Sequence, residues 1–375
     1  MTDSTDRPTE TKEDDGATKT FAGVINEDSL AYKLRIPVAL VILVLVLRPL
    51  VEQPWLLGFG QIAITMLIWM LFVSAFNLLF GYSGLLSFGH AMFFGTGIYA
   101  VAIGISKFNA PFLVSAIIGI ILAGAMGYVI GRLIVQKGEI YFAMLTLAFA
   151  QAIFFTVNNN PFGLTGGSDG LTQGTLPPWV ESFRGQIRIV LGGLEFDWYW
   201  LAAAIFLVAM LALWQVVRSP FGRSLLTIRE NEELARAMGV DTRRYKVSAF
   251  TFSAIFAAVA GILAEINNHG ASLENFGPFT SGDAVLMAIL GGVNYFFGPI
   301  AGAFLWLFSE EYLTDFETLN LVFVEVDLSG VLSYWQFLLG FIFVVIVVVS
   351  PKEGIWGYIR GALKRLYRLV RRVAG

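Results

Sequence analysis

Residues 219–246, SPFGRSLLTIRENEELARAMGVDTRRYK, carry a dense group of ionisable side chains inside a chain that is otherwise strongly apolar. Asn231 is a suitable N-cap, and Glu232 and Glu233 follow in the first turn, where acids favour the positive end of the helix dipole. Gly239 suits the position after the last turn, because glycine readily adopts positive φ. These residues support helix capping and ion pairing on a polar surface, so we expect a short helix of about two turns outside the lipid.

This short helix has a small apolar face. Leu234, Ala237 and Met238 lie on one side by their i, i+3, i+4 spacing. A helix of two turns is not stable alone in water, so the face needs a partner. A loop that only anchors membrane topology would explain the arginines, but not the cap and the terminal glycine. The pattern therefore favours docking to another protein.

Other kinds of site chemistry are poorly supplied in this sequence. The chain has no cysteine, which excludes disulfides, Cys-ligated zinc and thiol catalysis. It has only two histidines, His90 and His269, so we expect no metal site and no catalytic residues. No Gly-Lys dipeptide occurs, and a P-loop of the Walker A type is therefore absent.

Polar groups within the apolar stretches are costly in lipid and are candidates for function. Asn77 and His90 are predicted to lie on a translocation path. Hydrogen bonding between helices is the favoured alternative for Asn77, and a satisfied buried histidine explains His90 at least as well. Gly291 and Gly292 are further candidates for this path, because the open backbone at a glycine break can line a translocation path or change its shape.

The elements that position these residues are expected to be membrane-spanning helices. Apolar residues make up 56% of the 375-residue chain, charged residues only 14%, and the mean hydropathy is +0.70. Soluble domains average about 25% charged residues. Runs near 20 residues can cross a hydrocarbon core of about 30 Å as helices. We expect such spans at 36–53, 59–80, 86–106, 111–135, 140–157, 198–217, 247–268 and 333–349.

Residues 283–312 are predicted to form two short helices joined by a Gly/Pro break. The basic 218–246 segment and the basic C-terminus should both be cytoplasmic. An even number of crossings must then lie between spans 247–268 and 333–349, which two spans or one re-entrant hairpin would satisfy.

Six predicted spans precede the 218–246 segment, so the N-terminus should lie in the cytoplasm as well. The predicted fold is an all-α polytopic membrane protein of about ten spans.

The remaining segments complete the predicted domain organisation. Residues 1–30 are read as a disordered acidic cytoplasmic tail, because they can bury very little apolar surface. Residues 31–353 form the transmembrane domain, and 354–375 form a basic amphipathic helix suited to an anionic membrane surface. The 158–197 loop is extracytoplasmic and is either a plain connector or a docking surface.

Several motifs in order resemble one family. Glu233, Ala235 and Gly239 stand as E-x-A-x-x-x-G, which resembles the EAA loop of ABC-importer permeases, with Leu234 replacing the first alanine. The wider loop is similar to that of LivM-type permease subunits of branched-chain amino acid ABC importers, and it lacks the I-x-L-P ending of many other importer permeases. Further similar stretches are NLLFGYSGLLSFGHAMFFGTGIYA, YFAMLTLAF, LTGGSDGL and AILGGVNYFFGPIAGA.

This resemblance covers nearly all of residues 59–350 and implies an ABC-importer permease fold in the cell membrane. It implies a LivH-like sister permease, two ABC ATPase subunits that bind ATP and Mg²⁺, and an extracytoplasmic amino-acid-binding protein. This chain itself would bind no cofactor and no nucleic acid, and would not be an enzyme. The implied ATPase-coupling residues are Arg229, Glu230, Asn231, Glu232, Glu233, Leu234, Ala235, Arg236, Ala237, Met238, Gly239 and Val240.

The expected function is the translocation of branched-chain or similar hydrophobic amino acids. A related importer for urea, short amides or another small solute remains an alternative, because the permease sequence discriminates substrates weakly. A stand-alone secondary transporter is a second alternative, but no string of ionisable groups suggests a proton relay. An integral membrane enzyme would need clustered His, Asp or Glu at depth, which the sequence does not supply.

Overall fold

The structure is a computed structural model that describes residues 30–52, 60–172, 189–191, 194–196, 198–315, 318–321, 324–327, 335–349 and 353–362. Apart from Leu30, the predicted acidic tail lies outside these residues, as does the part of the predicted basic helix beyond residue 362. The chain divides into two compact units, residues 1–45 and 46–375, which we treat separately.

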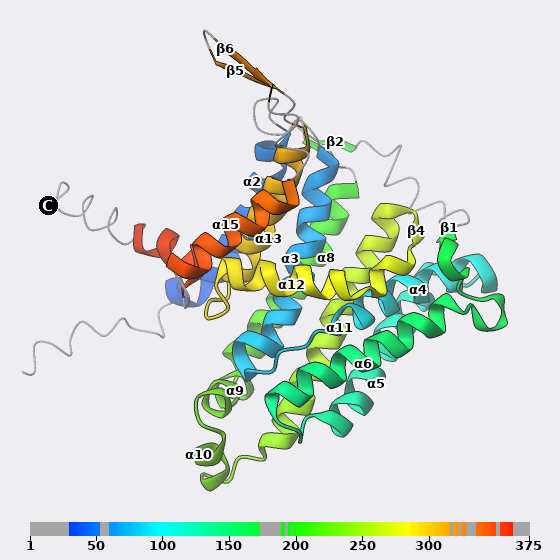
Figure 1. The fold of residues 1–375 in the computed structure, drawn as a ribbon, viewed down its shortest axis with the longest axis vertical. Coiled ribbons are helices and arrows are strands. Elements are labelled where there is room, and N and C mark those ends of the chain that lie inside the picture. Colours follow the sequence, from blue (N-terminus) through cyan, green and yellow to red (C-terminus); the bar gives the residue numbers. More distant parts are fainter. Residues whose placement is uncertain are drawn as a thin grey trace, which may run out of the picture. The chain divides into compact units, whose positions relative to one another are not determined.

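Helices dominate the described chain (Figure 1). The α-helices are α2 (Leu30–Val51), α3 (Gly60–Ser83), α4 (Ala91–Phe108), α5 (Phe112–Ile134), α6 (Glu139–Asn158), α8 (Trp198–Arg218), α9 (Pro220–Glu230), α10 (Glu232–Ala237), α11 (Thr242–Asn268), α12 (Pro278–Gly291), α13 (Gly298–Asp315) and α15 (Trp335–Val349). A further helix covers 354–362. Single 3₁₀ turns are η2 (Pro161–Gly163), η3 (Gly167–Asp169) and η4 (Leu273–Phe276).

Three short antiparallel strand pairs accompany the helices within the described ranges. They are β1 (Leu171–Thr172) with β4 (Gly270–Ala271), β2 (Ile189–Leu191) with β3 (Leu194–Phe196), and β5 (Thr318–Leu321) with β6 (Val324–Asp327). The β1–β4 pair joins the segment after α6 to the C-terminal end of α11. That end is opposite to the end of α11 that follows α10.

Six helices in the described part of the chain are long and apolar enough to cross a membrane: α3, α4, α5, α6, α8 and α11. The prediction of an all-α polytopic membrane protein is therefore confirmed, while the figure of ten spans stays a prediction. Three helix starts differ from expectation. Helices α2 and α11 begin at Leu30 and Thr242, earlier than the predicted 36 and 247, and α4 begins at Ala91 rather than near residue 86. Residues 84–87 are not helical, and Gly84 has a positive φ of 76°.

Helix α11 is at the centre of the 46–375 unit and packs against α3, α4 and α5. Small residues allow this close approach. Gly97 of α4 lies against the backbone of Ala258, and Gly261 lies against the backbone of Phe94. Close packing at small residues is the usual basis of helix association in lipid, where no hydrophobic effect drives helices together. The largest fully buried side chains include Phe72, Phe76, Phe93, Phe142, Phe206 and Phe250.

The predicted break inside residues 283–312 is confirmed. Helix α12 ends at Gly291, α13 starts at Gly298, and the two helices pack against each other. Gly292 ends α12 with a φ of 108°, a conformation that only glycine adopts without strain. Because α12 has 14 residues, its length is about 21 Å, which is less than a full hydrocarbon core.

Candidate functional site

Helices α9 and α10 form the short charged element between α8 and α11, and its cytoplasmic location stays a prediction. Pro220 stands in the first turn of α9, where a missing N–H costs nothing. Asn231 has an extended φ of −156° and separates the two helices. Its Oδ1 accepts a hydrogen bond from the Leu234 N–H at 2.9 Å, which confirms the N-cap. Gly239 follows α10 with a φ of 85°, as its sequence position predicted.

The apolar face of α10 points away from the rest of the chain. Leu234 is 54% exposed and Met238 is 60% exposed, and Ala237 is exposed between them. Ala235, on the other side of the helix, is completely buried. The helix is therefore anchored through one side and presents a small hydrophobic surface on the other.

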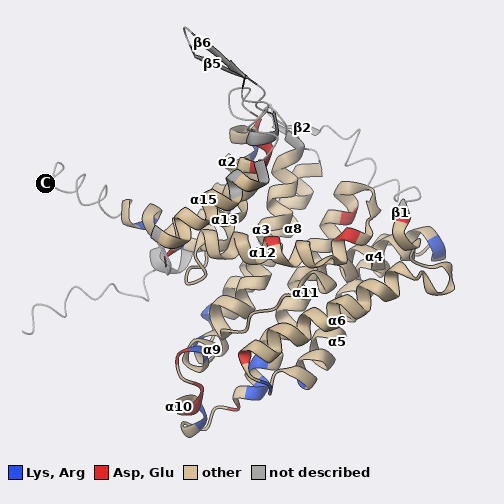
Figure 2. Ribbon diagram, viewed as in Figure 1, with Lys and Arg blue, Asp and Glu red and all other residues tan. Residues whose placement is uncertain are grey.

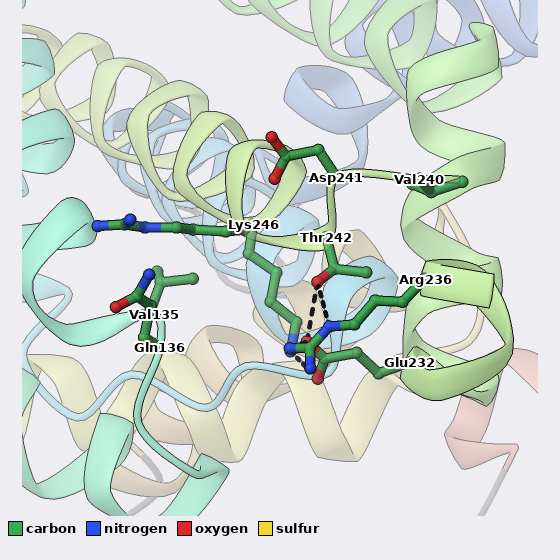
Figure 3. A pocket seen from close by; sticks show the side chains of 9 residues that line it. Val135, Gln136, Glu232, Arg236, Val240, Asp241, Thr242 and Lys246 are labelled. Carbon is green, nitrogen blue, oxygen red and sulfur yellow. Dashed lines mark hydrogen bonds and ion pairs between the residues drawn. The ribbon is translucent and has the colours of Figure 1, made fainter. Parts of the chain in front are cut away.

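A polar network centred on Glu232 fixes α10 to the first turns of α11 (Figure 3). One carboxylate oxygen of Glu232 lies 2.7 Å from Lys246 Nζ, and the other lies 2.6 Å from Arg236 Nη2. The Thr242 hydroxyl donates to that second oxygen at 3.0 Å and accepts from Arg236 Nε at 3.1 Å. Three side chains from two helices, Arg236, Thr242 and Lys246, thus share the Glu232 carboxylate.

Glu232 is the electrostatic centre of this network. Burial raises the pKa of its carboxyl group, whereas the hydrogen bond and the positive charge of Lys246 have the opposite, lowering effect. Thr242 and Arg236 add to it, so the net result is a pKa below the ordinary value. Lys246 is almost completely buried, which makes the Glu232 carboxylate its essential counter-charge.

Arg229 connects the end of α9 to the end of α3. Its Nη1 donates a hydrogen bond to the carbonyl oxygen of Gly81, and its aliphatic stem lies against Gly84. Leu225 and Ile228 of α9 are buried. Together with the Glu232 network, these contacts attach α9 and α10 to two of the candidate membrane spans, α3 and α11.

Asn77 lies one turn before Gly81 on the same face of α3 and is 2% exposed. Gly81 packs against both the Asn77 amide and the Val293 carbonyl in the α12–α13 break. Asn77 is therefore close to the break that holds Gly291 and Gly292. The carbonyl oxygen of Gly81 also accepts the hydrogen bond from Arg229. The structure thus brings the predicted path residues on α3 and α12 near the end of α9.

His90 is fully buried at the start of α4. Its Nε2 lies 3.2 Å from the hydroxyl of Ser253 in α11, and that hydroxyl donates to the Ala75 carbonyl at 2.5 Å. Ser253 therefore accepts from His90 Nε2–H. Phe72 stacks on the imidazole, and Phe76 and Phe93 meet it edge-on. These contacts join α3, α4 and α11, and a path role for His90 stays a prediction.

Gly291 and Gly292 occupy very close helix contacts. Gly291 lies against the backbone of Gly298 and Gly302 in α13. Gly292 lies against the backbone of Glu353 and Gly354, where the 354–362 helix begins. Packing alone explains both glycines, and their role in translocation stays a prediction.

Four residues of this arrangement were missed as site residues at the sequence level: Gly81, Thr242, Lys246 and Ser253. Gly81 could have been found, because it follows Asn77 by one helical turn. Lys246 is 14 residues from Glu232 and Ser253 is 163 residues from His90, so no local spacing rule joins them.

The length and the apolar composition of the helices define an integral membrane protein. The chain belongs to the family described as branched-chain amino acid transport system / permease component, which matches residues 58–347. No solved structure matches the chain.

Curated relatives are similar over most of their length. The "High-affinity branched-chain amino acid transport system permease protein LivM" of Escherichia coli (strain K12) is 27% identical over 76% of this chain and 71% of the relative. The LivM protein of Salmonella typhimurium is 26% identical over the same shares. The "Autoinducer 2 import system permease protein LsrC" of Enterobacter sp. (strain 638) is 24% identical over 73% of this chain and 72% of the relative.

Proposed function

We propose that this chain is the transmembrane permease subunit of an ATP-driven ABC importer. Its partners are a second permease, two ATPase subunits and an extracytoplasmic binding protein, and its N- and C-termini are cytoplasmic. The observation that supports this best is α10, a capped helix with an exposed apolar face and a firmly anchored opposite side. An ATPase groove would cover Leu234 and Met238, and the ATPases would bind ATP and Mg²⁺.

The coupling step follows from the attachments of α9 and α10. A movement of the ATPase pair would displace α10, and the Glu232–Lys246 pair would transmit the displacement to α11. The bond from Arg229 to the Gly81 carbonyl would transmit it to α3. Val293 at the α12–α13 break lies against Gly81, so the break would shift with α3. Access would alternate through these spans.

The proposed substrates are branched-chain or similar hydrophobic amino acids, in line with the names of the LivM relatives. A second candidate is another small solute, including urea or short amides. The LsrC relatives favour keeping it, because their name refers to the import of autoinducer 2. Competition of unlabelled solutes against leucine uptake by the reconstituted complex would separate the two candidates.

The first experiment replaces both exposed apolar residues of α10, as Leu234→Asp with Met238→Asp. Two interface anchors are lost, so ATPase affinity should fall at least about 30-fold, which is about 2 kcal/mol. The fold should persist, because both side chains are exposed. The measurement is co-purification of the ATPase subunits with the detergent-solubilised permease, together with its melting temperature.

The control is Phe162→Asp, which exchanges one exposed apolar side chain for a carboxylate at a position that is 96% exposed in the segment after α6. This control should keep full ATPase binding. Wild-type ATPase binding by the α10 variant would refute the coupling role. Substrate transport without any ATPase would instead support a stand-alone secondary transporter.

A further inference from the structure

A pocket of about 540 Å³ lies between the last turns of α5 and the first turns of α11. The lining residues are Tyr128 and Arg132 of α5, Asp241 just before α11, and Arg243, Arg244, Val247 and Ser248 of α11. Figure 2 shows Lys and Arg gathered where α11 begins, while the middle parts of the helices carry few charges.

The pocket carries an excess of positive charge. Arg244 pairs with Asp241 at 2.8 Å, so this pair is close to neutral. In the described part of the chain, Arg132 and Arg243 pair with no carboxylate. Arg132 Nη1 donates to the Tyr128 hydroxyl at 3.2 Å, and Arg243 Nη2 donates to the Arg132 carbonyl at 3.2 Å. Neutral groups hold both guanidinium groups in position without cancelling their charge.

Arg243 is held further by Gln136, whose amide oxygen accepts from Nε at 2.8 Å and from Nη1 at 2.7 Å when the amide is turned toward it. A guanidinium has five N–H donors, so most of those on Arg132 remain for a ligand. Two fixed guanidinium groups with spare donors suit a tetrahedral oxyanion, because their planar forks bind phosphate oxygens in pairs.

The pocket lies at the border between apolar and polar surface. The outward face of α5 is apolar and exposed, and it leads directly to Arg132 through Ile117, Ile118, Ile121, Leu122, Val129 and Leu133. Tyr128 is half-exposed one turn before Arg132. Tyrosine is enriched where a membrane span meets water, because its ring is apolar and its hydroxyl is polar. A ligand in this pocket can therefore have an apolar part along α5.

We infer that this pocket binds the phosphate of an anionic glycerophospholipid. Arg132 and Arg243 hold the phosphate oxygens, and the Tyr128 ring and Val247 contact the start of the apolar chains. Basic pockets between membrane helices are known to take such headgroups. Arg243 also lines the neighbouring pocket with Glu232 and Arg236, so the lipid would fix α5 to α11 next to the base of α10. The inference requires only a membrane protein and is independent of the importer proposal.

The test uses the full chain, purified and stripped of lipid in a neutral detergent. Phosphatidylglycerol is titrated in, with phosphatidylcholine and inorganic phosphate as separate arms. Native mass spectrometry counts bound lipid, and thermal unfolding reports stabilisation. We expect phosphatidylglycerol to bind and to raise the melting temperature, and the other two arms to have little effect.

The variant Arg132→Gln should weaken phosphatidylglycerol binding at least tenfold, and Arg132→Lys should fall between it and wild type. Arg132 is exposed, so both variants should fold. The control Arg223→Gln removes the same charge from an exposed position on α9 outside the pocket and should bind as wild type. Unchanged lipid binding by Arg132→Gln would overturn the inference. Equal stabilisation by inorganic phosphate would overturn it as well.

Discussion

At the level of single residues, Lys246 is a nearly buried charge that is stabilised by an ion pair with Glu232. Its side chain is 8% exposed, and its ammonium group lies 2.7 Å from a carboxylate that is itself one-third exposed. Taking one partner from a buried pair leaves an unpaired charge, which costs about 3–5 kcal/mol when both partners are fully buried. The partial exposure of Glu232 lets water screen the charge, so the cost here should be smaller.

The variant Glu232→Gln should therefore destabilise the protein by roughly 1–2 kcal/mol at pH 7. The folded pKa of Glu232 is below its ordinary value of 4.5, so the ion pair stabilises the fold above that pH. Its contribution is lost as the pH falls through the lower, folded pKa. Melting temperatures of wild type and variant should differ by a constant amount above about pH 5 and converge at more acidic pH.

Asp241→Asn is the matched control for this experiment. It removes the exposed ion pair with Arg244 but keeps a side-chain oxygen that can cap α11. Exposed ion pairs contribute little, so this change should be close to neutral at every pH. An equal loss of stability in both variants would show that the Glu232 network contributes no more to stability than the exposed pair between Asp241 and Arg244.

At the level of elements, the break between α12 and α13 is held from three sides. Gly81 of α3 lies against the Val293 carbonyl, and the two helices meet at Gly291 and Gly302. The 354–362 helix closes the third side. Trp356 stacks on Phe297 with ring centroids 5.3 Å apart, and the Arg360 guanidinium lies 5.5 Å from the centre of the Tyr295 ring. Such a close fit leaves no room for a β-carbon at Gly291.

The variant Gly291→Ala should consequently separate α12 from α13 and destabilise the protein by about 1–3 kcal/mol. Gly282→Ala is the control on the same helix, because a β-carbon there meets nothing within 4 Å. It should be neutral or stabilising by up to about 1 kcal/mol, since alanine favours the helix. Melting temperature and uptake are measured together. Loss of uptake by Gly291→Ala with an unchanged melting temperature would contradict the packing explanation and favour a role in the path.

At the level of the whole molecule, the sequence predicted what depends on local rules. Apolar runs located the six candidate spans, and turn chemistry located the cap at Asn231, the end of α10 at Gly239 and the α12–α13 break. The contacts that form the site could not be predicted from the sequence, because they join residues that are distant in the chain, such as Arg229 and Gly81. Even the fully buried His90 depends on Ser253, whose position follows only from the packing of α11 on α3 and α4.

The predicted topology can be tested directly, because the chain contains no cysteine and each introduced thiol is unique. Helix α6 has 20 residues, about 30 Å, which is enough to cross the hydrocarbon core between exposed Lys137 and exposed Ser168. In intact cells, a membrane-impermeant maleimide should label Ser168→Cys but not Lys137→Cys.

If α12 and α13 together contribute an even number of crossings, Gly361→Cys should be protected from the maleimide like Lys137→Cys. Labelling of Gly361→Cys from outside would require an odd number of crossings by α12 and α13 and would refute the cytoplasmic C-terminus. Equal labelling of Ser168→Cys and Lys137→Cys would show that α6 does not span the membrane.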